Sequence, residues 1–169
     1  MKTLTVYFSR AGENYVSGQL RRLAVGNTEK AARIIQKVTD GDLFSITMKK
    51  PYADDYNTCI EEARRDLRQK ARPALVSDID TDEYDVMYLG FPIYWGTMPM
   101  AVCTFLERHD FKGKVIYPFV THEGSGFASS LSDLKKEAQG AEIGKGLALH
   151  GTRIDQSAAE IRNWVKETL

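Results

Sequence analysis

Segments with strand character alternate with helical segments along this chain, and this alternation restricts the fold more than any other feature. The strand segments are apolar or β-favouring on both faces, which is typical of parallel strands covered by helices. We expect strands at 3–8, 43–46, 86–91, 115–120 and 143–150. We expect helices at 28–39, 56–71, 100–109, 128–138 and from Ile154 to Val165. This order predicts an α/β fold built on a doubly wound parallel sheet.

The predicted sheet has five strands in the order 2-1-3-4-5, with helices on both faces. In such sheets, ligands bind beyond the carboxyl ends of the strands, where the strand order reverses. The 169 residues suit one domain, 1–169, and no internal repeat suggests a second. One residue conflicts with the pattern: Pro118 cannot donate to a ladder, so it argues against a regular central strand at 115–120.

The first strand ends in Tyr-Phe-Ser-Arg at 7–10, and Gly-Asn-Thr-Glu at 26–29 opens the first helix, with Asn27 or Thr28 placed as its N-cap. The first N–H groups of a helix have no internal partner, and the helix dipole adds positive charge, so we interpret this segment as a phosphate site. Ser9, Asn27 and Thr28 can add donors. The alternative is an ordinary strand-loop-helix unit that binds nothing. Neither Gly-x-x-x-x-Gly-Lys-Ser/Thr nor Gly-x-Gly-x-x-Gly is present, which argues against nucleoside triphosphate and dinucleotide sites.

Two further loops follow strand ends and have unusual compositions. The loop that begins at Pro92 presents Tyr94 and Trp95, which suit either stacking on a flat ring or a plug or subunit interface. The loop that begins at Thr121 carries polar side chains and two glycines, which allow the backbone to approach a ligand closely. His122 in this loop is either a structural histidine or a group with a proton-linked role near a ligand.

Composition excludes several classes of function. Lys and Arg number 23 and Asp and Glu number 23, without the basic stripe that nucleic acid requires. Cys59 and Cys103 fit no metal spacing, and we expect buried or idle thiols in a reducing cytoplasm. The acidic run 78–85 lacks the calcium-loop pattern and is read as a solvated turn. Without a signal peptide or an apolar span of about twenty residues, we expect a soluble, cytoplasmic protein that binds neither nucleic acid nor membranes.

A phosphate site, a platform for a flat ring and a glycine-rich backbone loop together suit a mononucleotide, and FMN has all three matching parts. The motifs are Tyr-Phe-Ser at 7–9, Gly-Asn-Thr at 26–28, Gly-Phe-Pro-Ile-Tyr-Trp-Gly at 90–96 and Thr-His-Glu-Gly-Ser-Gly at 121–126. Through these motifs the chain resembles the flavodoxin family over essentially its full length. The resemblance implies a flavodoxin-like fold and FMN as cofactor.

The resemblance also implies the positions of the cofactor contacts. Ser9, Asn27 and Thr28 would bind the phosphate, the first isoalloxazine loop would follow Phe91 with Trp95 or Tyr94 on a ring face, and the second would follow Val120. No side chain is expected to perform covalent catalysis, and no metal is expected. The expected cofactor-binding residues are Ser9, Arg10, Asn27, Thr28, Pro92, Ile93, Tyr94, Trp95, Gly96, Thr121, His122, Glu123, Gly124, Ser125, Gly126 and Phe127.

The chain departs from the family pattern in three ways. Residues 11–26 interrupt the phosphate loop, and we expect this insertion to fold as a flap over the FMN. Arg10 adds a cation where the family usually uses neutral donors, so we expect it to pair with the phosphate. The balanced charge differs from the acidic surfaces of flavodoxins that shuttle electrons, which argues against a general shuttle.

Three functions fit these observations. The first is an FMN-binding electron-transfer protein, and the second is an FMN-dependent NAD(P)H:quinone or flavin oxidoreductase. The partner would be a redox protein or a small quinone-like acceptor, and the chain would be a monomer or a homodimer. The third is a flavin-free binding module on the same fold, because a fold does not fix a function.

Overall fold

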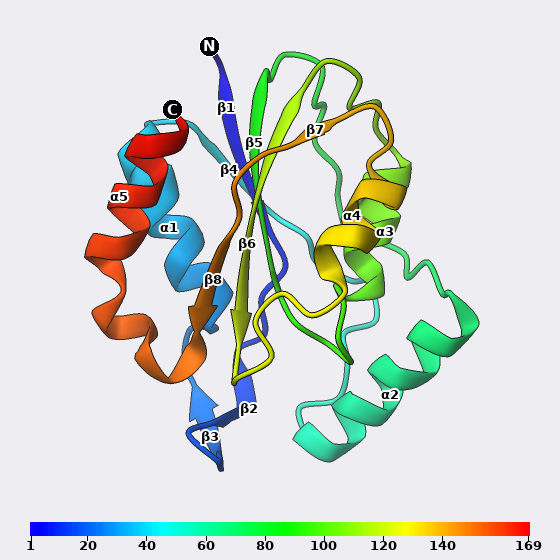
Figure 1. Ribbon diagram of the computed structural model, residues 1–169. Coiled ribbons are helices and arrows are strands. Elements are labelled where there is room, and N and C mark those ends of the chain that lie inside the picture. Colours follow the sequence, from blue (N-terminus) through cyan, green and yellow to red (C-terminus); the bar gives the residue numbers. More distant parts are fainter.

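A parallel sheet with helices on both faces forms the body of the protein in the computed structural model, which describes residues 1–169 (Figure 1). Its strands are β1 (Thr3–Tyr7), β4 (Asp42–Ser45), β5 (Val86–Pro92), β6 (Val115–His122), β7 (Glu142–Ile143) and β8 (Leu147–His150). Their order is β4-β1-β5-β6, with β7 and β8 both beside β6, and every pairing is parallel. The expected fold class and the order 2-1-3-4-5 are confirmed, with the fifth strand in two pieces.

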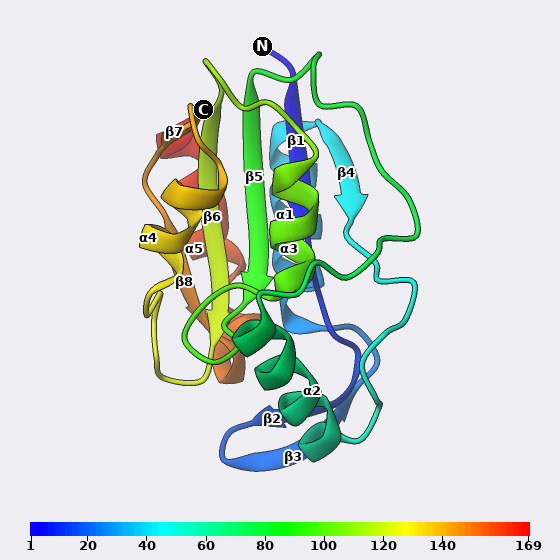
Figure 2. The same cartoon turned by 90° about the vertical axis from the view of Figure 1, so that its right-hand side faces the viewer.

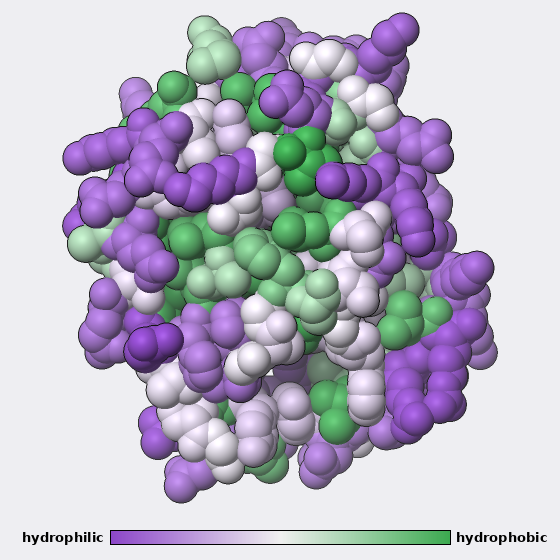
Figure 3. Space-filling model, in the orientation of Figure 1, coloured by the Kyte–Doolittle hydropathy of each residue, from purple (hydrophilic) through white to green (hydrophobic).

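Helices α1 and α5 lie on one face of the sheet, and α3 and α4 lie on the other (Figure 1). Alternation along β5 divides its apolar side chains between two clusters: Val86 and Tyr88 pack on the α1 and α5 side, whereas Met87 and Leu89 pack on the α3 side. Hydrophilic residues cover much of the surface seen in Figure 3. The helices are α1 (Asn27–Thr39), α2 (Tyr56–Gln69), α3 (Met100–Glu107), α4 (Ser130–Glu137) and α5 (Ala158–Thr168), with a 3-10 helix η1 (Gly151–Gln156) before α5.

The expectation that Pro118 disrupts its own strand is wrong, because β6 is continuous and pairs with β5 from Val115 to Thr121. The Ile116 carbonyl accepts a hydrogen bond from the Gly144 N–H at 2.9 Å, so the backbone nitrogen of Pro118, two residues on, faces the same side. On that side β7 pairs with residues 115–116 and β8 pairs with residues from 119 onward. The neighbouring strand is therefore interrupted where Pro118 has no N–H to offer.

The first helix begins one residue earlier than expected. Its N-cap is Gly26, not Asn27 or Thr28, and Ser9 Oγ accepts a hydrogen bond from the Glu29 N–H at 3.1 Å. A Cβ on Gly26 would lie 2.2 Å from Ser9 Oγ, so the absence of a side chain lets the end of β1 perform the capping.

Helices α2 and α3 each end two residues before the expected bound, at Gln69 and Glu107, and two later helices begin after the expected residue. Helix α4 starts at Ser130 rather than at Ala128, because Ala128 has a φ of 46°, which lies outside the helical region. Ile154 lies in η1, and α5 begins only at Ala158. Both differences fall at helix ends, where the apolar spacing continues into turns that are not α-helical.

The insertion at 11–26 folds as an antiparallel hairpin of β2 (Gly12–Val16) and β3 (Gln19–Leu23). Ser17 and Gly18 form its turn with φ values of 55° and 75°, the positive values that a two-residue hairpin turn requires. The hairpin is a separate sheet and lies below the carboxyl ends of the main strands, beside α2 (Figure 2).

Candidate ligand site at the carboxyl edge of the sheet

A cavity of about 310 Å³ opens at the carboxyl edge of the sheet. All three loops that the sequence singles out contribute to it, after β1, β5 and β6. The hairpin, α2 and the start of η1 complete its walls. The lining residues are Ser9, Arg10, Asn14, Tyr15, Asn27, Thr28, Tyr56, Cys59, Ile60, Ala63, Pro92, Ile93, Tyr94, Trp95, Thr121, His122, Glu123 and Gly151.

The N-terminus of α1 contributes polar groups to the cavity. Because Ser9 Oγ already accepts from Glu29, the N–H groups of Asn27 and Thr28 are the two first-turn donors without an acceptor in the chain. Both residues line the cavity. These two amides lie at the positive end of the helix dipole, an arrangement that suits an anion, and the binding of a phosphate there stays a prediction.

Arg10 lines the same cavity, but its guanidinium already has two acceptors. Nε donates to the carbonyl of Glu13 at 3.0 Å, and Nη2 donates to the carbonyl of Asp54 at 2.7 Å. Neither acceptor is charged, so the positive charge of Arg10 is not cancelled by these contacts. The pairing of Arg10 with a phosphate stays a prediction, and its observed contacts connect β1, the hairpin and the segment before α2.

The loop after β5 places two aromatic side chains differently. Tyr94 is packed against the core, edge-on to Phe8 with ring centroids 6.0 Å apart, and burial raises the pKa of its hydroxyl. Trp95 is 47% exposed and has a φ of 52°, an uncommon value for a bulky residue. Its indole Nε1 donates to the carbonyl of Ile60 at 2.8 Å, and the guanidinium of Arg64 lies 5.1 Å from its ring centroid. Trp95 is thus the more accessible of the two rings.

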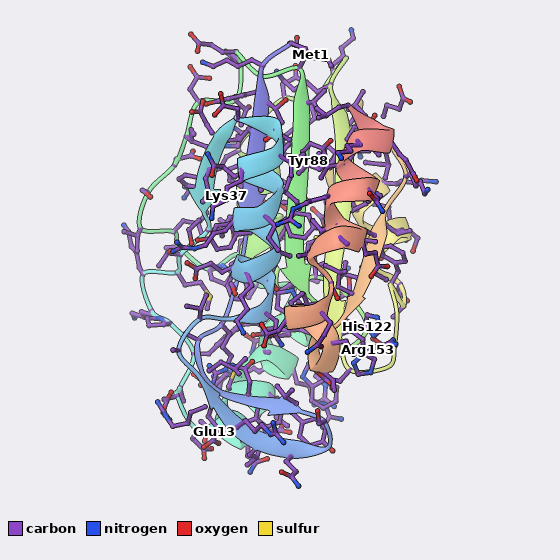
Figure 4. The ribbon with its side chains drawn as sticks, turned by 90° about the vertical axis from the view of Figure 1, so that its left-hand side faces the viewer. Met1, Glu13, Lys37, Tyr88, His122 and Arg153 are labelled. Carbon is purple, nitrogen blue, oxygen red and sulfur yellow. The ribbon has the colours of Figure 1, made fainter.

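The end of β6 and the loop after it contribute three polar residues to the cavity, Thr121, His122 and Glu123. The hydroxyl of Thr121 is hydrogen-bonded to that of Thr28 at 2.8 Å. His122 accepts a hydrogen bond at Nδ1 from the Gly124 N–H at 2.9 Å, and burial together with neighbouring His150 lowers the pKa of His122. The imidazole is therefore neutral near pH 7 and carries its proton on Nε2. Figure 4 shows His122 at the carboxyl end of the sheet.

Five of the expected cofactor residues do not line the cavity. Phe127 is partly buried against the core, and a Cβ on Gly146 would lie 2.8 Å from its ring. The three loop glycines have positive φ values, which residues with a side chain rarely adopt. The five residues are Gly96, Gly124, Ser125, Gly126 and Phe127.

Seven lining residues were not expected from the sequence. Tyr56, Cys59, Ile60 and Ala63 lie on one face of α2, whose apolar spacing predicts the helix but not the cavity beside it. Gly151 follows β8, and a Cβ there would lie 2.4 Å from Glu123 Oε1. A search of the sequence for glycines after strand ends could have identified Gly151 as a site residue. The remaining two belong to the hairpin: Asn14 and Tyr15.

Comparisons with known proteins agree with this architecture. A family model described as flavodoxin, Flavodoxin_4, matches residues 20–168. No curated protein matches the chain. The structure is similar to crystal structures of candidate flavoproteins from Bacteroides eggerthii DSM 20697 and Bacteroides uniformis ATCC 8492. Each has 30% identity and a TM-score of 0.77 and covers 98% of this chain, with 96% and 97% of the other chain covered.

A more distant structure is a flavoprotein from Lactobacillus acidophilus NCFM in complex with FMN. It has 20% identity and a TM-score of 0.65, with 92% of this chain and 97% of that chain covered, so it supports the fold alone. No helix of the present structure combines the length and hydrophobicity that crossing a membrane would need. With a family match that extends over most of its length, the chain belongs to the flavodoxin family.

Proposed function

We propose that this protein binds FMN at the carboxyl edge of its sheet and uses it to transfer electrons. The observation that carries the proposal is the convergence of three separate loops on one cavity, with unpaired helix amides at one end and Trp95 at the rim. The FMN complex of the Lactobacillus acidophilus protein, which shares the fold, supports the choice of ligand.

The residues present fit the parts of FMN. The free N–H groups of Asn27 and Thr28 suit a phosphate, and no carboxylate is hydrogen-bonded to them. Glu123 directs its Oε2 toward Thr152, whereas its Oε1 accepts no hydrogen bond from the chain and is free for a hydroxyl of the polyol part. The aromatic and apolar residues of the β5 loop and α2 suit the ring.

In this assignment each segment has a separate task. The α1 amides would bind and orient the phosphate, and the β5 and β6 loops would hold the ring and exclude water from it. His122, neutral near pH 7, would offer an Nε2–H donor without adding a positive charge. Bound FMN would supply the reversible uptake of electrons, and the protein would tune it through the groups placed around the ring.

Titration of the purified, FMN-free protein with FMN tests the proposal. We expect loss of free-FMN fluorescence with a stoichiometry of one, and a shifted visible spectrum. Asn27→Ala removes a side chain beside the proposed phosphate site, and comparison of its FMN binding with that of the wild type measures the contribution of this residue. Reductive titration of the loaded protein should then resolve two one-electron steps. Protein that takes up no FMN would instead point to a flavin-free binding module.

A second candidate function, an FMN-dependent NAD(P)H:quinone or flavin oxidoreductase, is supported by the wall opposite the three loops. Tyr15 of the hairpin stacks on Tyr56 of α2, with ring centroids 6.0 Å apart and an interplanar angle of 24°. An aromatic wall of this kind suits a flat second substrate. Steady-state oxidation of NADH or NADPH with a quinone, using FMN-loaded protein, separates the two functions, because a carrier alone gives no sustained turnover.

A further inference from the structure

The β2–β3 hairpin has almost no core of its own. It pairs only with itself, and Val16 is its one buried residue. An isolated two-stranded hairpin is marginally stable in water, so contacts with the rest of the protein must fix its position. Its polar contacts occur at its two ends, and between them Tyr15 stacks on Tyr56 of α2. Figure 4 shows Glu13 on the hairpin, below the ends of the main strands.

The base of the hairpin is attached to the start of α2. Glu13 Oε1 accepts a hydrogen bond from the Tyr56 N–H at 2.9 Å, and Arg22 forms an ion pair with Asp54 at 2.7 Å. Arg10 joins the same region, since it donates to the carbonyls of both Glu13 and Asp54. The base is therefore held by several independent contacts.

The tip of the hairpin is attached to the far side of the cavity by one small cluster. Ser17 Oγ donates to Thr152 Oγ1 at 3.1 Å, and Thr152 Oγ1 donates to Glu123 Oε2 at 2.8 Å. The Ser17 N–H also approaches Glu123 Oε2, at 3.4 Å. These three residues, which we call the tip cluster, are joined by hydrogen bonds between partly exposed groups, which contribute less than buried ones because water competes for them.

We propose that the hairpin is a lid on the ligand site, that the tip cluster holds it shut, and that its base acts as the hinge. Asn14 and Tyr15, between the two ends, line the cavity, so release of the tip would move part of the cavity wall. Elements with few buried contacts open at low free-energy cost, and lids are drawn from such elements. The proposal rests on the proposed function only in taking FMN as the ligand.

Cys59 provides a reporter of opening that needs no ligand. Its side chain lines the same cavity as the hairpin residues, it is 2% exposed, and burial raises the pKa of its thiol. A thiol in this state reacts slowly with alkylating reagents until the site opens. Cys103 in α3 is 3% exposed within the core, and burial raises its pKa to about 12. Labelling of Cys103 therefore reports unfolding of the whole protein.

The first experiment measures N-ethylmaleimide labelling of each cysteine in FMN-free protein by peptide mass mapping. Thr152→Val removes the central hydroxyl of the tip cluster at nearly constant volume. We expect Cys59 to be labelled about fivefold faster than in the wild type, with Cys103 unchanged. Ser132→Ala, which removes an exposed hydroxyl on α4 that is bonded only to a nearby carbonyl, is the matched control and should leave both rates unchanged.

The second experiment locks the lid. Because the side-chain oxygens of Ser17 and Thr152 are 3.1 Å apart, Ser17→Cys with Thr152→Cys places two thiols within reach of a disulfide after a small adjustment. In the oxidised form we expect labelling of Cys59 to fall below the wild-type rate. FMN association and dissociation, followed by flavin fluorescence, should both slow by tenfold or more. Reduction of the same protein should raise both rates again, to the wild-type values or above them, because the reduced variant also lacks the Thr152 hydroxyl. The oxidised and reduced forms therefore serve as controls for each other.

Each result decides the proposal. Slower labelling of Cys59 in the locked form, together with faster labelling in Thr152→Val, supports a lid. Equal Cys59 labelling in the locked and reduced forms would overturn it, and so would a parallel rise of Cys59 and Cys103, which indicates loss of global stability. If the wild type takes up no FMN, the proposed function fails while the labelling of Cys59 still decides whether the hairpin opens.

Discussion

The hydroxyls of Thr28 and Thr121 form a buried hydrogen bond of 2.8 Å that joins the first turn of α1 to the end of β6. Thr28 and Thr121 are 2% and 5% exposed, so water has little access to either hydroxyl and does not easily replace a lost partner. We predict that Thr121→Val lowers the free energy of unfolding by about 1–3 kcal/mol, because it leaves the Thr28 hydroxyl without a partner. Urea unfolding of FMN-free protein measures this loss.

The double variant Thr28→Val with Thr121→Val distinguishes the hydrogen bond from other effects. Removing both partners eliminates the unpaired hydroxyl, so we expect the double variant to lose less stability than the sum of the two single variants. The coupling free energy should lie at about 0.5–3 kcal/mol. Additive losses would show that the two hydroxyls do not stabilise one another and that the contact between α1 and β6 depends on packing alone.

Gly151 is a lining residue whose replacement should affect the ligand more than the fold. A Cβ there would lie 2.4 Å from Glu123 Oε1 and 2.8 Å from Asn27 Nδ2, and both are ends of side chains that can move. We predict that Gly151→Ala displaces these groups and weakens FMN binding by about tenfold, a cost of about 1.4 kcal/mol. Fluorescence titration with FMN measures the change.

Gly113→Ala is the matched control for that variant. Nothing lies within 4 Å of a Cβ on Gly113, but its φ of 78° disfavours alanine. It should therefore lose about 1 kcal/mol of stability without a change in FMN affinity. The assignment of Gly151 to the site fails if the two variants affect affinity equally.

The sequence predicts the main sheet and the three loops well because both depend on local patterns. Continuous apolar strands such as Val86–Phe91 must be buried on two faces, which requires helices between them. In a parallel sheet the carboxyl ends of neighbouring strands lie at one edge, so Ser9, Trp95 and His122 meet there although they are far apart in the chain.

The sequence could not predict that the hairpin and α2 form part of the cavity wall, because their positions depend on contacts between distant segments. The spacing of Tyr56, Ile60 and Ala63 predicts a helix with one apolar face, but this spacing is the same for a face on the core and a face on a cavity. Pro118 shows the same limit, since its effect depends on the interruption of the neighbouring strand at residues 144–146.

Trp95 lines the cavity and is attached to α2, and its proposed contact with a ligand ring can be separated from this attachment. Trp95→Phe keeps an aromatic ring but removes the Nε1 donor to Ile60, whereas Trp95→Ala removes both. If ring stacking contributes to binding, Trp95→Ala should weaken FMN affinity by about 2- to 13-fold relative to Trp95→Phe, which corresponds to about 0.5–1.5 kcal/mol. Titrations of both variants with FMN provide the comparison. Equal affinities of the two variants would place the flavin ring away from this side chain.

His122 should make stability depend on pH just below neutrality. Its pKa in the folded protein is lowered from an ordinary value of 6.5 by burial and by His150, so the folded state disfavours the imidazolium. Between the folded and unfolded pKa values the unfolded chain binds more protons, and stability therefore falls as pH decreases through this window. Protonation would also remove the acceptor of the Gly124 N–H. The stability contribution is fully present above pH 6.5 and decreases below it.

Urea unfolding of the wild type and of His122→Gln between pH 5 and pH 8 tests this dependence. We expect the wild type to lose stability more steeply than the variant as the pH falls from about 6.5. The carboxyl groups with lowered pKa, Asp54 and Asp55, have an ordinary value of 3.8 and titrate below this range, so they do not obscure the result. Titration of the His122 ring by NMR gives the pKa directly. A value at or above 6.5 would show that burial does not disfavour the charged ring.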